Sequence, residues 1–172
     1  MKLSTLNLIT LTAALTGSVS AQNYISGTVK CGKPDISQPP IEVGDRASHV
    51  LMVMKMTCRY ITPAQLAGLK LTTESVAELT EIVGGKFQDR GYVVIATENG
   101  DKAYAHTQDT GIMKEGGAFT DRGTWTITDG TGKLRGIKGK GTYKSSGSSE
   151  GEVSQMEGEY SLPPSSAVSA KE

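Results

Sequence analysis

The chain has 172 residues, enough for one domain. Its 18 basic and 18 acidic side chains balance, so the composition gives no electrostatic reason to expect nucleic acid or anionic lipid as a partner. Glycine is abundant, with 21 residues, while aromatic residues make up only 5% of the chain, a composition typical of short strands joined by many tight turns.

The first 21 residues have the features of a cleavable secretory signal. Lys2 supplies a positive start, residues 3–15 are largely apolar, and residues 19–21 are the small residues that a signal peptidase requires. The alternative is a buried N-terminal helix, but from Gln22 the sequence changes to strand-like alternation. We therefore expect export, either to a periplasm or to the extracellular space.

The chain therefore divides into three predicted parts. Residues 1–21 are the signal peptide, residues 22–162 form one domain, and residues 163–172 are a polar tail that we expect to be disordered. The apolar stretch of the signal is shorter than a comfortable membrane span, and no later segment is apolar enough to cross a membrane.

Two cysteines, Cys31 and Cys58, follow the signal. An exported chain meets an oxidising compartment, so we expect them to form a disulfide. Closing that loop would stabilise the fold by roughly 3–4 kcal/mol in the chain-entropy model. Two free buried thiols or part of a metal site are the alternatives. A metal site needs more ligands than these cysteines with His49 and His106 supply, and we expect no metal or other cofactor.

The first predicted strand covers residues 24–30, and a loop rich in proline and glycine follows over 32–46. Residues 49–60 carry the clearest strand pattern of the chain. One face of this strand is apolar or amphipathic, whereas the other face becomes polar towards its end. The first face consists of Val50, Met52, Met54, Met56, Cys58 and Tyr60.

Residues 73–83 allow two interpretations. Val76, Leu79 and Val83 fit helical spacing, but Val76, Thr80 and Ile82 also fit strand alternation. We favour a strand, because the neighbouring segments are predicted strands and adjacent strands usually pair. Residues 61–70 contain Pro63 and remain unassigned.

The second half of the chain repeats strand and turn. The predicted strands cover 91–97, 102–110, 119–128, 133–144 and 152–162, with a flexible loop over 145–151. The turn at Asn99-Gly100 is a strong hairpin signal. Strands of even spacing joined by short turns predict an all-β fold, an antiparallel barrel of about eight strands, with a β-sandwich as the alternative.

The segment Gly123–Gly136 resembles the strand–turn–strand element of allene oxide cyclase-type barrels and dirigent proteins. In those families a strand leads into Gly-Gly-Thr-Gly, whereas here Asp129 replaces the first glycine. Residues 30–162 are also similar to a group of uncharacterised exported bacterial proteins, through Cys31-Gly32-Lys33-Pro34, Val43-Gly44-Asp45-Arg46, Asn99-Gly100-Asp101-Lys102 and Gly139-Lys140-Gly141-Thr142-Tyr143. The resemblance implies an eight-stranded barrel with an internal cavity, and it assigns no active-site residue.

Candidate ligand-binding residues follow from the predicted inner faces. Three methionines are the first candidates, as an adaptable cavity wall, although core filling is the simpler interpretation. Tyr104 and His106 share one face of a strand and would converge on a pocket if that face were the inner one. The full set is Met52, Met54, Met56, Tyr60, Tyr104, His106 and Trp125.

Three functions remain open. The first is an exported, non-catalytic barrel that binds a small apolar or amphipathic molecule. The second is an isomerase or cyclase, prompted by the family resemblance alone. The third is a cell-surface structural or interaction module. No catalytic or metal motif favours an enzyme, and the oligomeric state is open.

Overall fold

A computed structural model describes residues 22–36 and 38–164 of the chain. The predicted signal peptide, residues 1–21, lies outside the described residues, as do residues 165–172 of the predicted tail. In the part of the chain that the structure describes, no helix is long and apolar enough to span a membrane.

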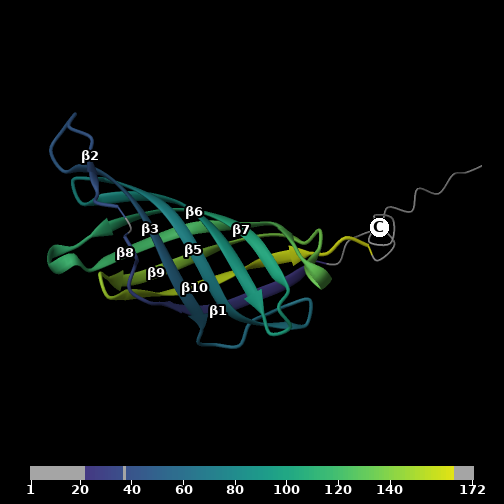
Figure 1. Cartoon of the computed structure of the whole chain (residues 1–172). Coiled ribbons are helices and arrows are strands. Elements are labelled where there is room, and N and C mark those ends of the chain that lie inside the picture. The colour runs from purple at the N-terminus through teal and green to yellow at the C-terminus, as the bar shows by residue number, and fades with distance from the viewer. Residues whose placement is uncertain (1–21, 37, 165–172) are drawn as a thin grey trace, which may run out of the picture.

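Eight long antiparallel strands close a barrel within the described residues (Figure 1). They run in the order β3-β1-β10-β9-β8-β7-β6-β5, and β5 then pairs with β3 to complete the circle. The strands are β1 (Asn23–Cys31), β3 (His49–Tyr60), β5 (Leu69–Val83), β6 (Lys86–Thr97), β7 (Lys102–Met113), β8 (Phe119–Gly130), β9 (Lys138–Ser148) and β10 (Gly151–Ser161). The predicted all-β barrel is confirmed, and the sandwich alternative is not adopted.

Short strands and 3₁₀ helices lie in the connections between the barrel strands. β2 (Ile41–Glu42) pairs with β3 at one end, and β4 (Gln65–Leu66) forms a tight hairpin with the start of β5. Two single-turn 3₁₀ helices, η1 (Glu115–Gly117) and η2 (Gly132–Leu134), lie in the connections on either side of β8.

The predicted disulfide between Cys31 and Cys58 is confirmed, with an S–S distance of 2.03 Å. The two cysteines are direct partners in the β1–β3 register, so both inward-facing side chains meet without a detour of the backbone. The bond therefore joins β1 to β3.

Two local predictions have different outcomes. The strand interpretation of residues 73–83 is confirmed, because β5 pairs with β3 on one side and β6 on the other. The predicted loop over residues 145–151 is wrong: β9 continues through Ser148, and β10 begins at Gly151. Ser145 is buried and its hydroxyl donates to Ser154 across the hairpin at 3.1 Å, which gives this polar segment a reason to stay extended.

One end of the barrel is capped by apolar side chains from its loops. Leu134 follows β8, Ile137 precedes β9, and Leu66 lies in the β3–β5 connection; all three are fully buried in one core cluster. Asp129, the residue that replaces a glycine in the family pattern, shapes the same end. Its Oδ1 accepts hydrogen bonds from the backbone N–H groups of Gly130 at 2.7 Å and Gly136 at 2.8 Å.

Candidate functional site

The barrel interior combines an apolar part with an acidic part. Alternate residues of each strand face inward, and near the capped end these are mostly aliphatic: Ile25, Val93, Ile95 and Ile127 line the interior there. Other inward positions carry carboxyl groups. The six are Glu74 and Glu78 on β5, Asp89 on β6, Asp109 on β7, Asp121 on β8 and Glu152 on β10.

The strand register brings several of these acids together. Asp89 and Asp109 are direct partners across β6 and β7. Like charges in directly opposite positions destabilise a sheet, and burial makes the repulsion stronger. Both residues are buried, so this pair is costly to keep fully ionised.

Burial and mutual repulsion therefore raise the pKa values of the interior acids. Burial, assisted by the charges of Asp89 and Glu152, raises the pKa of Glu78 to about 9. Burial also raises the pKa of Asp109 to about 7, against the lowering effect of a hydrogen bond from Tyr143. Near neutral pH the lumen thus holds a mixture of neutral and ionised carboxyl groups.

The remaining acids follow the same rule. Burial is the main cause that raises the pKa of Glu152 to about 7 and that of Asp121 to about 6, with neighbouring carboxylates adding to it in both cases. Burial raises the pKa of Glu74 and of Asp89 as well. Groups with pKa values moved this far are concentrated at functional sites in proteins, although structural networks also produce them.

Two tyrosines donate hydrogen bonds to two of these acids. Tyr60 donates a hydrogen bond from its hydroxyl to Glu74, and Tyr143 donates to Asp109 at 2.5 Å. Burial raises the pKa of Tyr60 and of Tyr143, so both phenols keep their protons and act as donors. The Glu152 side chain lies beside the disulfide, with Oε1 at 3.6 Å from Cys31 Sγ.

Several buried polar atoms have no hydrogen-bond partner among the described residues. One is a donor, Nε1 of Trp125, whose side chain is only 6% exposed. The others are the hydroxyl oxygens of Thr80 and Thr107 and the Oδ1 atoms of Asp89, Asp109 and Asp121. Buried polar groups in native proteins almost always find a partner in protein or water, and of these residues Thr107 and Trp125 line an internal cavity.

A cavity of about 80 Å³ lies between the apolar and acidic parts. Its wall includes Trp125, Ala105, Thr107, Glu78 and Glu152. The volume is large enough for a few water molecules or for a ligand of a few non-hydrogen atoms. The lumen is therefore mostly filled by side chains and keeps a small amphipathic space.

The structure brings together part of the predicted ligand-binding set. Trp125 lines the cavity, and Tyr60 points into the same interior through its bond to Glu74. Met56 is buried in the core and Met54 packs against it, while Met52 is half-buried on the same strand face. None of these three methionines lines the cavity, whose methionine is Met156 from β10.

Tyr104 and His106 lie on the outer surface of the barrel. Tyr104 is 38% exposed and His106 is exposed as well, whereas Ala103 and Ala105 occupy the inward positions of β7. His106 packs edge-to-face on Tyr92, with ring centroids 4.7 Å apart. The structure thus separates these two residues from the lumen.

Sequence reasoning missed the acids of the lumen, although a signal for them existed. On β6, Asp89 has the same parity as Val93 and Ile95, and on β8 Asp121 has the same parity as Trp125. The apolar residues of each strand mark its inner face. Every other residue on that same face, including these acids, is then expected to point into the barrel.

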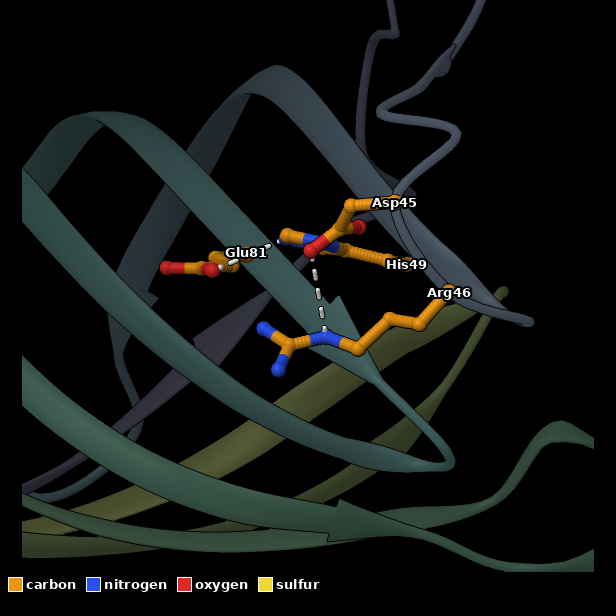
Figure 2. A network of polar contacts seen from close by, with 4 residues as sticks. All are labelled: Asp45, Arg46, His49 and Glu81. Atoms are coloured by element: carbon orange, nitrogen blue, oxygen red, sulfur yellow. Dashed lines mark hydrogen bonds and ion pairs between the residues drawn. The ribbon is translucent and has the colours of Figure 1, made fainter.

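A second polar cluster lies outside the lumen, at the uncapped end (Figure 2). His49 is 8% exposed; its Nδ1 lies 2.5 Å from Asp45 and its Nε2 lies 2.9 Å from Glu81. The hydrogen bond with His49 lowers the pKa of Asp45. Because Asp45 lies in the loop before β3 and Glu81 on β5, this cluster attaches the loop to the barrel wall.

No chemistry of metal ions follows from either cluster. Among the described residues, no group of three or more His, Cys, Asp or Glu side chains is arranged to hold a metal ion. The acids of the lumen come from five strands around the wall.

Comparisons with known proteins address the fold. Neither a protein-family model nor a curated protein matches the sequence. A conserved protein of unknown function from Rhodopseudomonas palustris has a similar structure, with a TM-score of 0.51 and 8% identity, over 82% of this chain and 99% of that one. A pterocarpan synthase dirigent protein aligns with a TM-score of 0.48 and 9% identity, over 91% and 98% of the two chains. The first likeness shows a shared barrel fold, and function must be argued from the site.

Proposed function

We propose that this protein is exported and acts as a non-catalytic barrel that binds a small amphipathic molecule in its lumen. The observation that carries the proposal is the cavity whose wall joins aliphatic side chains to carboxyl groups. Unpartnered buried atoms such as Trp125 Nε1 support it, because a bound molecule would satisfy them.

The size of the cavity limits the ligand. Pockets for drug-sized molecules occupy about 300–1,000 Å³, whereas this space is about 80 Å³. The ligand is therefore a compact molecule of a few non-hydrogen atoms. The flexible side chain of Met156 in the wall adapts to small differences in ligand shape.

Export rests on the sequence of residues 1–21 together with the disulfide between Cys31 and Cys58. Disulfides persist in oxidising compartments and are rare in the cytosol. The intact mass of the protein, recovered from culture medium or periplasm of its own host, tests this part. We expect a chain that begins at Gln22 with both cysteines oxidised; recovery of only the full-length chain from the cytosol would contradict export.

Native mass spectrometry of the protein purified from its host tests ligand binding. We expect a small molecule that co-purifies with the folded protein and is lost on unfolding. The substitution Ala105→Leu fills the cavity from β7 and should abolish the adduct. Its matched control, His106→Leu, changes the adjacent outward position and should keep it; an adduct that survives Ala105→Leu in a folded protein would overturn the lumen site.

One observation favours acid–base catalysis as a second candidate. Glu152, whose pKa burial raises to about 7, stands in the cavity wall beside apolar side chains, and a carboxyl group near neutrality is suited to proton transfer. An isomerase would convert the co-purifying molecule, and Glu152→Gln would stop conversion even at saturating concentrations of that molecule. An unchanged molecule after prolonged incubation counts against this candidate.

A further inference from the structure

We propose that the ligand of the lumen is a small organic cation, a protonated amine that also carries an oxygen acceptor. In this arrangement the ammonium group lies between Glu78 and Glu152, and the rest of the molecule lies against Trp125. The inference rests on the proposed ligand-binding function and names the chemical class of the ligand.

The charge distribution of the molecule gives the first argument. The cavity wall includes the carboxyl groups of Glu74, Glu78 and Glu152 and contains no Lys, Arg or His side chain. Every described lysine and arginine is exposed on the outside. A buried carboxylate without a counter-charge is costly, and in the empty lumen protons reduce that cost. A cationic ligand would take the place of those protons.

The unpartnered atoms give a second and independent argument. Two buried polar atoms of the cavity wall, Thr107 Oγ1 and Trp125 Nε1, have no hydrogen-bond partner among the described residues. An ammonium group carries donors and no acceptor, so it complements a wall that holds the Thr107 hydroxyl and the carboxyl groups of Glu78 and Glu152. An ether or hydroxyl oxygen on the ligand would accept from Trp125 Nε1.

The aromatic wall fits the same ligand. The Trp125 side chain lines the cavity, and an indole ring attracts cations more strongly than any other side-chain ring. Among the described residues the acids do not form a metal site. The spread of carboxyl groups around the wall suits an organic cation, which distributes its contacts over several atoms.

Proton linkage follows from the titratable groups in and behind the cavity wall. Glu74 and Glu78 on β5, Tyr143 on β9 and Glu152 on β10 line the cavity. Behind them, Tyr60 on β3 donates to Glu74, Asp109 on β7 accepts from Tyr143, and the charges of Asp89 on β6 and Asp121 on β8 act on Glu78. The acids lose protons between about pH 6 and 9 in the empty protein. A cation therefore binds more tightly as the pH rises through this range, and its binding releases protons.

Three probes of matched size test the proposal on the full mature protein: aminopropanol as the cation, propanediol as the neutral form and hydroxypropanoate as the anion. Binding is measured by Trp125 fluorescence and by calorimetry in two buffers of different ionisation enthalpy. We expect aminopropanol to bind at least about tenfold more tightly than propanediol, one pKa unit of differential interaction. We also expect its affinity to rise with pH and its binding to release protons.

Variants locate the cation. Glu152→Gln should weaken aminopropanol binding about tenfold and leave propanediol binding unchanged, since one charge is lost at constant shape. Glu159→Gln, an outward position on the same strand, is the control and should have no effect. Equal binding of aminopropanol and propanediol overturns the cation while leaving the lumen site intact. Failure of all three probes, together with no co-purifying molecule, overturns both proposals.

Discussion

At the scale of single residues, Trp125 decides how the lumen is shaped. Its indole lies across the inward positions of β9 and β10, and both positions are glycine. A Cβ atom built on Gly141 would lie 2.3 Å from Trp125 Cζ2, and one built on Gly158 would lie 2.4 Å from the same atom. These glycines therefore make the room that the large ring occupies.

The substitution Gly141→Ala tests this packing. We expect the free energy of unfolding to fall by about 1–3 kcal/mol, because the added methyl group overlaps both the indole ring and the backbone oxygen of Glu157. Urea unfolding measures the change. Gly32→Ala is the matched control, since the nearest atom to its added Cβ is 3.8 Å away. Equal stability of the two variants would show that the indole does not lie where we describe it.

The buried carboxyl group of Glu78 predicts a pH dependence of stability. An unfolded chain releases this proton near the ordinary carboxyl pKa of 4.5, whereas the folded protein holds it up to a pKa of about 9. The folded state therefore binds more protons between these values, and stability falls as the pH rises through them. Urea unfolding at about pH 5, 7 and 9 should show this fall, and Glu78→Gln should flatten it. A slope that is unchanged in the variant would place the titrating group elsewhere.

For single residues, the sequence predicts which side chains face the interior only where one of the two alternating faces of a strand is plainly apolar. Trp125 shares a parity with Ile127, and the structure places both inside. On β7 the inner face could carry either the alanines or Tyr104 and His106. The larger size of Tyr104 and His106 did not indicate which face turns inward. Ala103 and Ala105 face inward and belong to the same core cluster as Ile127 and Val93.

At the scale of elements, a loop is fastened to the barrel by His49. Its ring nitrogens face carboxylate oxygens on two elements, the loop before β3 and β5. Nδ1 lies 2.5 Å from Asp45 and Nε2 lies 2.9 Å from Glu81, both within hydrogen-bond distance. The single residue therefore ties the β2–β3 connection to a strand far away in sequence.

Removal of this side chain should loosen the connection. We expect His49→Ala to lower the free energy of unfolding by about 1–2 kcal/mol, since two hydrogen bonds to charged groups are lost. Limited proteolysis within residues 38–48 should accelerate, and hydrogen exchange should increase there while the rest of the barrel is unchanged. Glu159→Gln serves as a surface control. Unaltered proteolysis would mean that other contacts hold the loop.

Element boundaries were predictable where a turn signal or alternation was strong, as at Asn99-Gly100 between β6 and β7. They were not predictable in the serine- and glycine-rich segment after Lys144. Its strand character comes from pairing with β8 and β10, a long-range effect that a local composition of Ser and Gly does not reveal.

At the scale of the whole molecule, the balanced composition conceals a separation of charge. The chain has equal numbers of acidic and basic side chains. Six of the acids face the interior, while all the described lysines and arginines are exposed. The outer surface is therefore more basic than the sequence suggests. For this reason the net charge of the chain alone does not predict its partners.

This separation predicts a difference between the native and unfolded isoelectric points. Burial keeps protons on Glu78 and on part of the other interior acids near neutral pH, and unfolding releases these protons. Isoelectric focusing of one sample, with and without urea, should show a higher isoelectric point for the folded protein. Identical values would mean that the interior acids titrate normally.

The central claim, a ligand site inside the barrel, has a direct probe in Trp125, the only tryptophan of the chain. Its indole N–H gives a single resonance in a proton–nitrogen NMR spectrum, from a buried donor that has no hydrogen-bond partner among the described residues. Titration with the co-purifying molecule, or with the three small probes, should shift this resonance saturably in the native protein and not in Ala105→Leu. A resonance that stays fixed with every molecule, or that shifts equally in the folded Ala105→Leu variant, would contradict the account.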